Sequence, residues 1–296
     1  MVSQTVYKNR PAVTVESEQL RMTVLPEDGA KIASLVMRGS EKELLLTKGG
    51  ENYKRLTYDG SYVDSECSAF DDMFPTIDPY TPTGGEYAGI TYPDHGECCR
   101  IPYEVNLLEN GVSLVARSKV FSAVYEKTVS VSDDGGIDVS YSIKNLSDAP
   151  FECIYAGHIM LKGEDGMLLR TPFPDDAPIE MIFATEGASP TARDRLVGFS
   201  PKTGAAYKFY YTDKIEKGLL EICYPDGHTL RLEYDEQKLP YLGVWLNNGE
   251  FQDIYSLSPE PCTAPFDAPD KAKARGYACE IPGNGALEFT IHVSLQ

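Results

Sequence analysis

The chain of 296 residues is poor in positive charge. It has 27 lysine and arginine residues against 45 aspartate and glutamate residues, which leaves a net charge of −18 with histidine neutral. Nucleic-acid binding depends on clustered lysine and arginine side chains that neutralise phosphates, and the sequence contains no such cluster. Anionic membrane surfaces are disfavoured for the same reason. The acidity therefore argues against nucleic-acid and membrane partners.

Long apolar runs are also missing. Residues 1–10 are polar and lack an apolar stretch after a basic start, so no secretory leader is recognisable. No stretch approaches the roughly 20 consecutive apolar residues of a membrane-spanning helix. The seven cysteines are odd in number and form no C-x-x-C pair, and the adjacent Cys98 and Cys99 cannot easily bridge each other. We expect a cytoplasmic protein with reduced thiols.

Motifs for cofactors and metals are absent as well. The sequence has no G-x-G-x-x-G, Walker or G-x-S-x-G signature. Its four histidines and seven cysteines lack the spacing of a zinc or iron site. We therefore predict chemistry that needs neither a nucleotide cofactor nor a metal.

Helical periodicity is almost absent, whereas apolar and polar residues alternate along most of the chain. Turn sequences at Asn110-Gly111, at residues 133–136 and at residues 225–228 separate alternating segments and predict three hairpins. Leu287 to Leu295 reads as a closing strand. We predict an all-β fold, a large antiparallel β-sandwich that forms one domain over residues 1–296.

Two segments depart from this alternation. Residues 269–275, rich in lysine and alanine, predict one short helix that Asp267 could cap. Residues 50–103 are irregular but hold many tyrosine, proline, glycine and aspartate residues. A long aromatic segment of this kind inside a β domain is usually functional.

Two histidines are candidates for acid–base chemistry. His158 follows Gly157 in a strand that is apolar on both faces, so it is either a core histidine bonded to a carbonyl or a proton donor at the floor of a pocket. His95 stands in a turn made by Pro93 and Gly96, beside charged neighbours such as Arg100. It is either a presented imidazole or part of a surface turn.

The remaining candidates are a carboxylate near the C-terminus and groups that could touch a ligand. Glu260 lies between two prolines that offer it few amide donors, which suits a general base, although an exposed loop glutamate is the simpler alternative. Asp71 and Asp72 lie next to each other in an apolar setting, so one of them should bind a polar ligand or an arginine. Trp245, the only tryptophan, either stacks on a sugar or fills the core.

Several of these stretches, taken in order, resemble the aldose 1-epimerase (galactose mutarotase-like) family, in particular its less studied bacterial branches. The resemblance covers nearly the whole chain. Its segments are Met22–Leu35, Phe70–Ile77 with Asp94–Glu97, Gly157-His158, Leu242–Asn247 and Ser258–Cys262.

The resemblance implies a β-supersandwich and an isomerase that interconverts the α and β anomers of a free sugar without a cofactor. It implies that Glu260 takes the proton of the anomeric hydroxyl and that His158 protonates the ring oxygen. His95 would bind the substrate near the same oxygen, and Asp72 would accept a sugar hydroxyl. A carboxylate and an imidazole can move both protons near neutral pH.

One family motif is missing. The sugar-binding Asn-Arg-Ile sequence has no counterpart, and Tyr53-Lys54-Arg55 is the nearest candidate. Two alternatives therefore stay open: a non-catalytic carbohydrate-binding or sugar-sensing domain on the same fold, and a sugar-phosphate epimerase in which Arg55 and Arg100 bind the phosphate. The expected partner in each case is a small carbohydrate.

Overall fold

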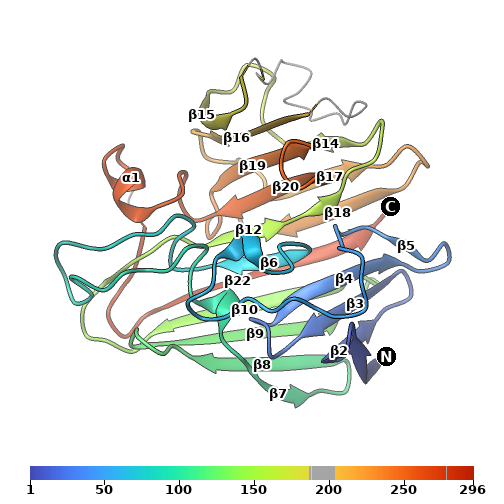
Figure 1. Cartoon of the computed structure of the whole chain (residues 1–296), viewed down its shortest axis with the longest axis horizontal. Coiled ribbons are helices and arrows are strands. Elements are labelled where there is room, and N and C mark those ends of the chain that lie inside the picture. Colours follow the sequence, from blue (N-terminus) through green and yellow to red (C-terminus); the bar gives the residue numbers. More distant parts are fainter. Residues whose placement is uncertain (187, 189–203, 278) are drawn as a thin grey trace.

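Antiparallel strands dominate the structure, a computed structural model that describes residues 1–186, 188, 204–277 and 279–296 (Figure 1). The larger of the two main sheets contains 12 strands and the smaller contains 8. The prediction of an all-β sandwich is therefore confirmed. In the described part of the chain, no helix is long and apolar enough to cross a membrane.

The 12-stranded sheet runs from the N-terminal strands to the upper edge of Figure 1. Its central path is β1 (Val2–Tyr7), β2 (Arg10–Glu16), β3 (Leu20–Leu25), β4 (Lys31–Met37), β6 (Phe70–Met73), β12 (Ala156–Ile159), β20 (Tyr255–Cys262), β19 (Tyr241–Asn248), β16 (Ala205–Tyr211) and β15 (Ile179–Ala184), with β5 (Lys42–Glu43) beside β4 and β13 (Leu161–Lys162) beside β20.

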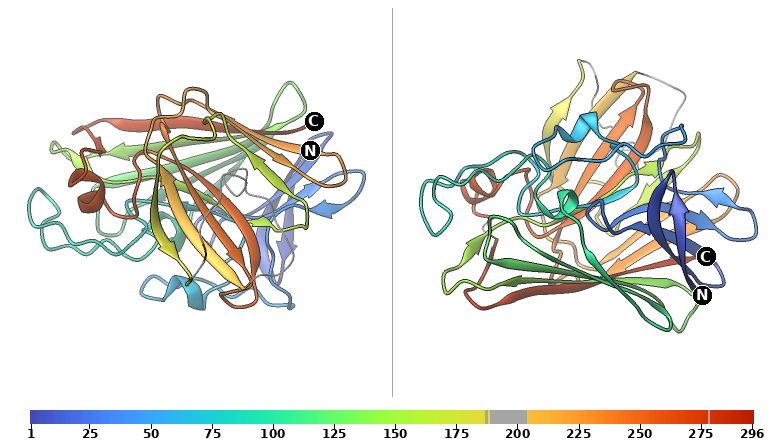
Figure 2. Two further views of the ribbon diagram at one scale, coloured as in Figure 1. Left: turned by 90° about the horizontal axis from the view of Figure 1, so that it is seen from above. Right: turned by 60° about the horizontal axis from the view of Figure 1, so that its bottom comes forward.

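The 8-stranded sheet forms the second layer, whose green and red strands lie lowest in the right-hand view of Figure 2. Its order is β14 (Leu168–Arg170), β17 (Leu219–Cys223), β18 (Thr229–Tyr234), β22 (Ala286–Leu295), β10 (Ile137–Asn145), β9 (Ala123–Val131), β8 (Gly111–Arg117) and β7 (Glu104–Leu107). A two-stranded sheet pairs β11 (Phe151–Glu152) with β21 (Glu280–Ile281).

The turns predicted from the sequence connect neighbouring strands of this second sheet. Asn110-Gly111 separates β7 from β8, residues 133–136 separate β9 from β10, and residues 225–228 separate β17 from β18. The closing strand is β22, which lies between β18 and β10. All three hairpins are confirmed. Gly135 and Gly227 supply positive φ angles of 86° and 90° in their turns, whereas Gly111 begins β8, where a Cβ atom would lie 2.3 Å from the Val129 carbonyl oxygen.

The short helix is α1 (Pro269–Lys273), but its predicted cap is wrong. Ala268 is the N-cap residue and no side chain caps the helix. Asp267 instead turns toward β16, where its carboxylate accepts a hydrogen bond from the Tyr210 hydroxyl at 2.7 Å. All seven cysteines are free thiols, as predicted.

Period-two alternation in β6 divides two adjacent aspartates between the two faces of the large sheet. Asp72 faces the smaller sheet, where Lys127 of β9 pairs with it. Asp71 faces the opposite, outer side and accepts a hydrogen bond from Tyr62 in the short 3₁₀ helix η1 (Tyr62–Asp64). The irregular residues 50–103, which include a second 3₁₀ helix, η2 (Cys98–Arg100), thus contribute to the cover of this outer face.

Candidate active site

A cleft of about 530 Å³ opens on the outer face of the large sheet. Three of the residues predicted from the sequence to carry chemistry line it together: His95, His158 and Glu260. They come from a loop, from β12 and from β20, which are far apart in the sequence. Among the described residues, no group of histidine, cysteine and acidic side chains is arranged to hold a metal ion.

Glu260 lies at the floor of the cleft and is fully buried. It stands opposite Gly243 of β19, where a methyl group would lie 3.2 Å from its Oε2 atom and 2.6 Å from the ring of Tyr210. The glycine therefore makes room for both side chains. Burial raises the pKa of Glu260 above its usual value, against the opposing effect of Lys208.

Lys208 of β16 joins two carboxylates at this floor. Its Nζ atom is 2.9 Å from Glu260 Oε2 and 2.7 Å from Asp267 Oδ1. Burial disfavours the charged lysine, but the two carboxylates raise its pKa above the usual range. Burial also opposes ionisation of Asp267, yet Lys208 holds the pKa of that carboxyl below its usual value. The three groups form one buried charge cluster with a net negative charge.

His158 is 7% exposed and presents its Nε2 atom to Glu260 Oε1 at 3.6 Å. Its Nδ1 atom has no hydrogen-bond partner among the described residues, so the expectation of a core histidine bonded to a carbonyl is not met. Burial, together with the neighbouring His95 and the positive charge of Lys208, holds the pKa of His158 well below its usual value. His158 is therefore a neutral imidazole at pH 7.

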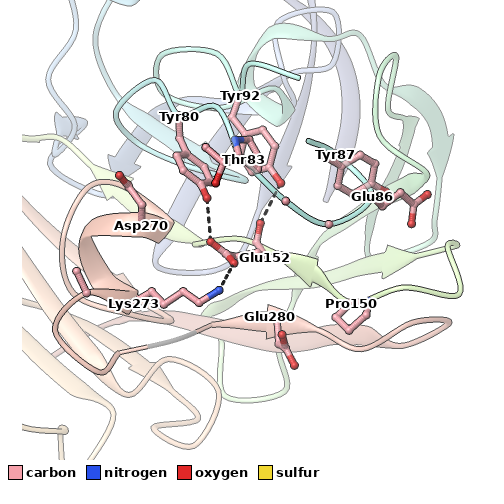
Figure 3. A pocket seen from close by; sticks show the side chains of 14 residues that line it. Tyr80, Thr83, Glu86, Tyr87, Tyr92, Pro150, Glu152, Asp270, Lys273 and Glu280 are labelled. Atoms are coloured by element: carbon pink, nitrogen blue, oxygen red, sulfur yellow. Dashed lines mark hydrogen bonds and ion pairs between the residues drawn. The ribbon is translucent and has the colours of Figure 1, made fainter. Parts of the chain in front are cut away.

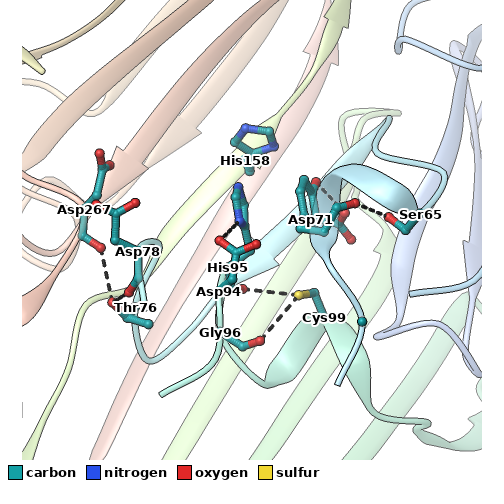
Figure 4. Close-up of polar contacts among 12 residues, drawn as sticks. Ser65, Asp71, Thr76, Asp78, Asp94, His95, Gly96, Cys99, His158 and Asp267 are labelled. Atoms are coloured by element: carbon teal, nitrogen blue, oxygen red, sulfur yellow. Dashed lines mark hydrogen bonds and ion pairs between the residues drawn. The ribbon is translucent and has the colours of Figure 1, made fainter. Parts of the chain in front are cut away.

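His95 is the more exposed of the two histidines and lies beneath His158 in Figure 4, with their ring centroids 6.0 Å apart. Its Nδ1 atom is 2.7 Å from Asp94 Oδ1, and its ring stacks on Tyr62 at 3.9 Å. Burial opposes ionisation of Asp94, but the hydrogen bond and charge of His95 hold the pKa of that carboxyl below its usual value. The pair thus directs the second nitrogen of His95, Nε2, away from Asp94.

Backbone geometry and one arginine hold His95 in this position. Its φ angle of 60° is in the left-handed region, which costs energy for a residue other than glycine. Arg100 is 4% exposed and its guanidinium donates to five backbone carbonyls, among them those of Asp94 and Gly96 on either side of His95. Arg100 was expected to bind substrate or phosphate. Its N–H donors are already occupied by backbone carbonyls, so Arg100 instead holds the loop in place.

Two other expected ligand-binding residues also lie away from the cleft. Asp72 is paired with Lys127 at 2.8 Å and accepts a hydrogen bond from the Tyr155 hydroxyl at 2.7 Å, between the two sheets. Arg55 binds Asp28 at 2.7 Å and the carbonyl of Glu27. The strand alternation that directs Asp71 to the outer face of the sheet, where it pairs with Lys31 at 2.8 Å, turns Asp72 to the inner face, so the expectation that Asp72 binds sugar in this pocket is corrected.

Trp245, by contrast, lines the cleft beside Phe251. Their ring centroids are 5.9 Å apart, with 33° between the ring planes. The ring is half-buried and borders the cleft, so the structure does not support the alternative in which Trp245 fills the core.

Lys208, Asp267 and Tyr62 are site residues that the sequence analysis missed. Lys208 had a usable signal, since it is the single charge in the aromatic strand Ala205–Tyr211, and a charge in such a strand must be paired when buried. Asp267 was assigned to a helix cap. Tyr62 had no signal beyond its place in the irregular, aromatic segment.

A second cavity of about 670 Å³ lies by α1 and contains none of the residues predicted for the site (Figure 3). Its central carboxylate, Glu152, is already held by Tyr80 at 3.0 Å and by Lys273 at 2.8 Å. Other carboxylates, such as Asp270 and Glu280, also line this cavity, but its described lining contains no imidazole to act with them as in the first cleft.

Comparisons with known proteins agree with the resemblance at the level of fold. No protein-family model and no curated protein sequence matches the chain. Among solved structures, a Klebsiella pneumoniae subsp. pneumoniae protein provisionally described as an aldose 1-epimerase is 14% identical, with a TM-score of 0.74 over 98% of this chain and 81% of that one.

Two further structures are similar over nearly their full lengths. A galactose mutarotase-like protein from Clostridium acetobutylicum is 14% identical, with a TM-score of 0.70 over 100% of this chain and 98% of that one. A galactose mutarotase related enzyme from Lactobacillus acidophilus is also 14% identical, with a TM-score of 0.64 over 96% and 97%. The chain therefore has the fold of the galactose mutarotase-like proteins.

Proposed function

We propose that this protein is an isomerase that interconverts the α and β anomers of a free aldose by opening and closing the sugar ring. The observation that carries the proposal is the buried carboxylate of Glu260, which shares one cleft with two imidazoles and lies 3.6 Å from the nearer one, His158. Ring opening requires one proton to leave the anomeric hydroxyl and another to reach the ring oxygen. A carboxylate and an imidazole supply both transfers.

Glu260 is the base. Its Oε1 atom has no hydrogen-bond partner among the described residues, so it is free to accept the proton of the anomeric hydroxyl. Burial raises the pKa of Glu260, which strengthens it as a proton acceptor, while Lys208 opposes this effect and favours the ionised carboxylate.

We assign the role of proton donor to His95, whereas the resemblance implied that His158 has this role. Asp94 Oδ1, 2.7 Å from Nδ1, orients the His95 ring so that Nε2 is the nitrogen left to exchange a proton with the ring oxygen. The pKa of His158 lies well below its usual value, so its imidazole is neutral and we do not assign it the role of proton donor. It serves as a neutral hydrogen-bonding group beside the reacting oxygens.

The charges of the cleft favour an unphosphorylated sugar. Arg55 and Arg100 bind protein groups elsewhere, and Lys208 is shared between two carboxylates. The described lining therefore offers no uncommitted lysine or arginine for a phosphate, and Asp267 and Glu260 would repel one. This weakens the alternative of a sugar-phosphate epimerase.

The test follows the approach to anomeric equilibrium of freshly dissolved α-aldoses by polarimetry and by NMR exchange. We expect acceleration by the wild-type protein, a loss of about 10²–10⁴-fold in kcat for Glu260→Gln, and no loss for Glu104→Gln on the edge strand β7. Unchanged rates over a broad panel of aldoses would refute the isomerase. Sugar binding without acceleration would instead support the non-catalytic carbohydrate-binding domain.

A further inference from the structure

Polar and apolar groups occupy opposite ends of the cleft. The charged floor is closed to solvent, with Glu260 0% and Lys208 8% exposed. The mouth is formed by large apolar side chains that remain open, with Phe251 42% and Val63 53% exposed. A sugar must therefore enter with its anomeric carbon first, and whatever is attached to its far end faces an apolar opening.

The mouth is held in place by the loop between β19 and β20. Asn247 fixes this loop in two directions, since its Nδ2 atom donates to the carbonyl of Phe251 at 3.0 Å and its Oδ1 atom accepts from the Phe251 amide at 3.2 Å. Gln252 donates to the carbonyl of Val63 at 3.2 Å and so ties the two sides of the opening together. The apolar surface is thus preformed.

Trp245 connects the mouth to the floor. It lies two residues beyond Gly243 on β19, about 6.8 Å along the strand, and Gly243 is the residue opposite Glu260. Its ring lies near Phe251 and Phe183, with centroid separations of 5.9 Å in both cases. An aromatic wall therefore begins about one sugar ring away from the base.

We propose, on the premise of the function above, that the substrate is a reducing disaccharide or longer oligosaccharide rather than a monosaccharide. The reducing ring lies on the charged floor with its anomeric hydroxyl at Glu260. The second ring covers Trp245 and Phe251, because the C–H groups on the face of a pyranose pack well on aromatic rings. A lone monosaccharide would leave this wall in water and turn hydroxyl groups toward it.

Binding can be followed separately from catalysis, because Trp245 is the only tryptophan of the chain. We expect cellobiose, maltose or lactose to shift the tryptophan emission to shorter wavelength and to bind more tightly than glucose or galactose. A glucose ester with an apolar tail, 6-O-octanoyl glucose, tests whether the mouth takes an alkyl group instead. Tighter binding of this ester than of every disaccharide would overturn the proposal.

The kinetic arm compares kcat/KM for anomer exchange on disaccharides and monosaccharides. In the wild type we expect the ratio of kcat/KM for a disaccharide to kcat/KM for a monosaccharide to exceed one for at least one disaccharide. Phe251→Ala should lower this ratio about two- to tenfold, the value of one aromatic contact, and Phe251→Tyr should restore it. Leu107→Ala, an equally exposed apolar truncation on the distant strand β7, should change neither rate.

The outcomes separate the two proposals. Acceleration on monosaccharides that depends on Glu260, with no disaccharide preference and no effect of Phe251→Ala on the ratio, overturns the oligosaccharide substrate and leaves the isomerase standing. No acceleration on either class overturns both. A disaccharide preference that falls with Phe251→Ala supports both.

Discussion

Two buried lysine–carboxylate pairs lie on opposite faces of the same sheet, and they are nearly identical in length. Lys127 is 2.8 Å from Asp72 between the two sheets, and Lys208 is 2.9 Å from Glu260 in the cleft. The inner pair is closed, because Tyr155 binds the second oxygen of Asp72. The outer pair is open, because Glu260 Oε1 accepts no hydrogen bond from the described residues.

Under the proposed function, this difference separates a structural charge from a chemical one. Burial and a lysine partner are common to both carboxylates, so neither feature identifies a base. What differs is an oxygen atom left without a hydrogen bond beside a cavity that a ligand can enter. The lysines differ as well: Lys127 also donates to the carbonyl of Ala30, whereas Lys208 also pairs with the carboxylate of Asp267.

Replacing each carboxylate by its amide should give the largest difference between the two lysine–carboxylate pairs. Asp72→Asn leaves Lys127 as an uncompensated buried charge and should lower the free energy of unfolding by about 3–5 kcal/mol. Glu260→Gln leaves Lys208 paired with Asp267, so it should cost no more than about 2 kcal/mol. Its loss should appear in kcat instead, at about 10²–10⁴-fold. Urea unfolding and polarimetry measure the two quantities. Equal destabilisation by both substitutions would contradict the distinction.

Substitutions of the two histidines in the cleft test which of them donates the proton. His95→Gln should lower kcat by about 10²–10³-fold, because it removes the proposed proton donor. His158→Gln should cost only about tenfold, since a glutamine amide still donates a hydrogen bond as a neutral imidazole does. Polarimetry measures both losses, and a larger loss in kcat for His158→Gln than for His95→Gln would return the donor role to His158.

The pH dependence tests the charge cluster around Glu260. Activity requires the ionised carboxylate, so kcat/KM should fall as the pH drops through the raised pKa of Glu260. Lys208 lowers this pKa and Asp267 raises it. Lys208→Met should therefore move the acid limb upward by about one to three pH units, and Asp267→Asn should move it downward. Shifts of both variants in one direction would show that they act by distortion and not by charge.

Alanine substitutions at two glycines should give the smallest effects. A Cβ atom at Gly243 would lie 2.6 Å from Tyr210 and 3.2 Å from Glu260 Oε2. Gly243→Ala should therefore cost about 1–3 kcal/mol of stability and several-fold in kcat. At Gly157, beside His158, the nearest atom would be 3.5 Å away, an ordinary contact. Gly157→Ala should leave kcat nearly unchanged. Thermal unfolding and polarimetry compare the two, and a larger kcat loss for Gly157→Ala would contradict the packing argument.

The fold could be predicted because its signals are local. Alternating strands and turn residues such as Asn110-Gly111 determine hairpins between neighbours in sequence, and these hairpins build most of the 8-stranded sheet. The pairing of β6 with β12, and of β12 with β20, joins segments far apart in the chain. Nothing in the alternation specifies such partners, and neither pairing was predicted from the sequence.

The site could be predicted only where a residue type is rare in its setting. A histidine in an apolar strand and a glutamate between prolines are conspicuous, and both line the cleft. Asp71 and Asp72 are adjacent and chemically equal, so their assignment depends on which face of β6 is the inner one. Arg100 is charged and near His95, but the five carbonyls that occupy it come from backbone geometry that no side-chain pattern reveals.

The left-handed backbone of His95 has a consequence for how such a site can diversify. Glu260 and His158 are carried by paired strands, whereas His95 is carried by a loop that Arg100 fastens from within. Changes elsewhere in the loop can alter the outline of the cleft without disturbing the strands that bear Glu260 and His158. The position of the carboxylate therefore depends on the sheet, whereas the position of His95 depends on the loop and on the arginine that holds it.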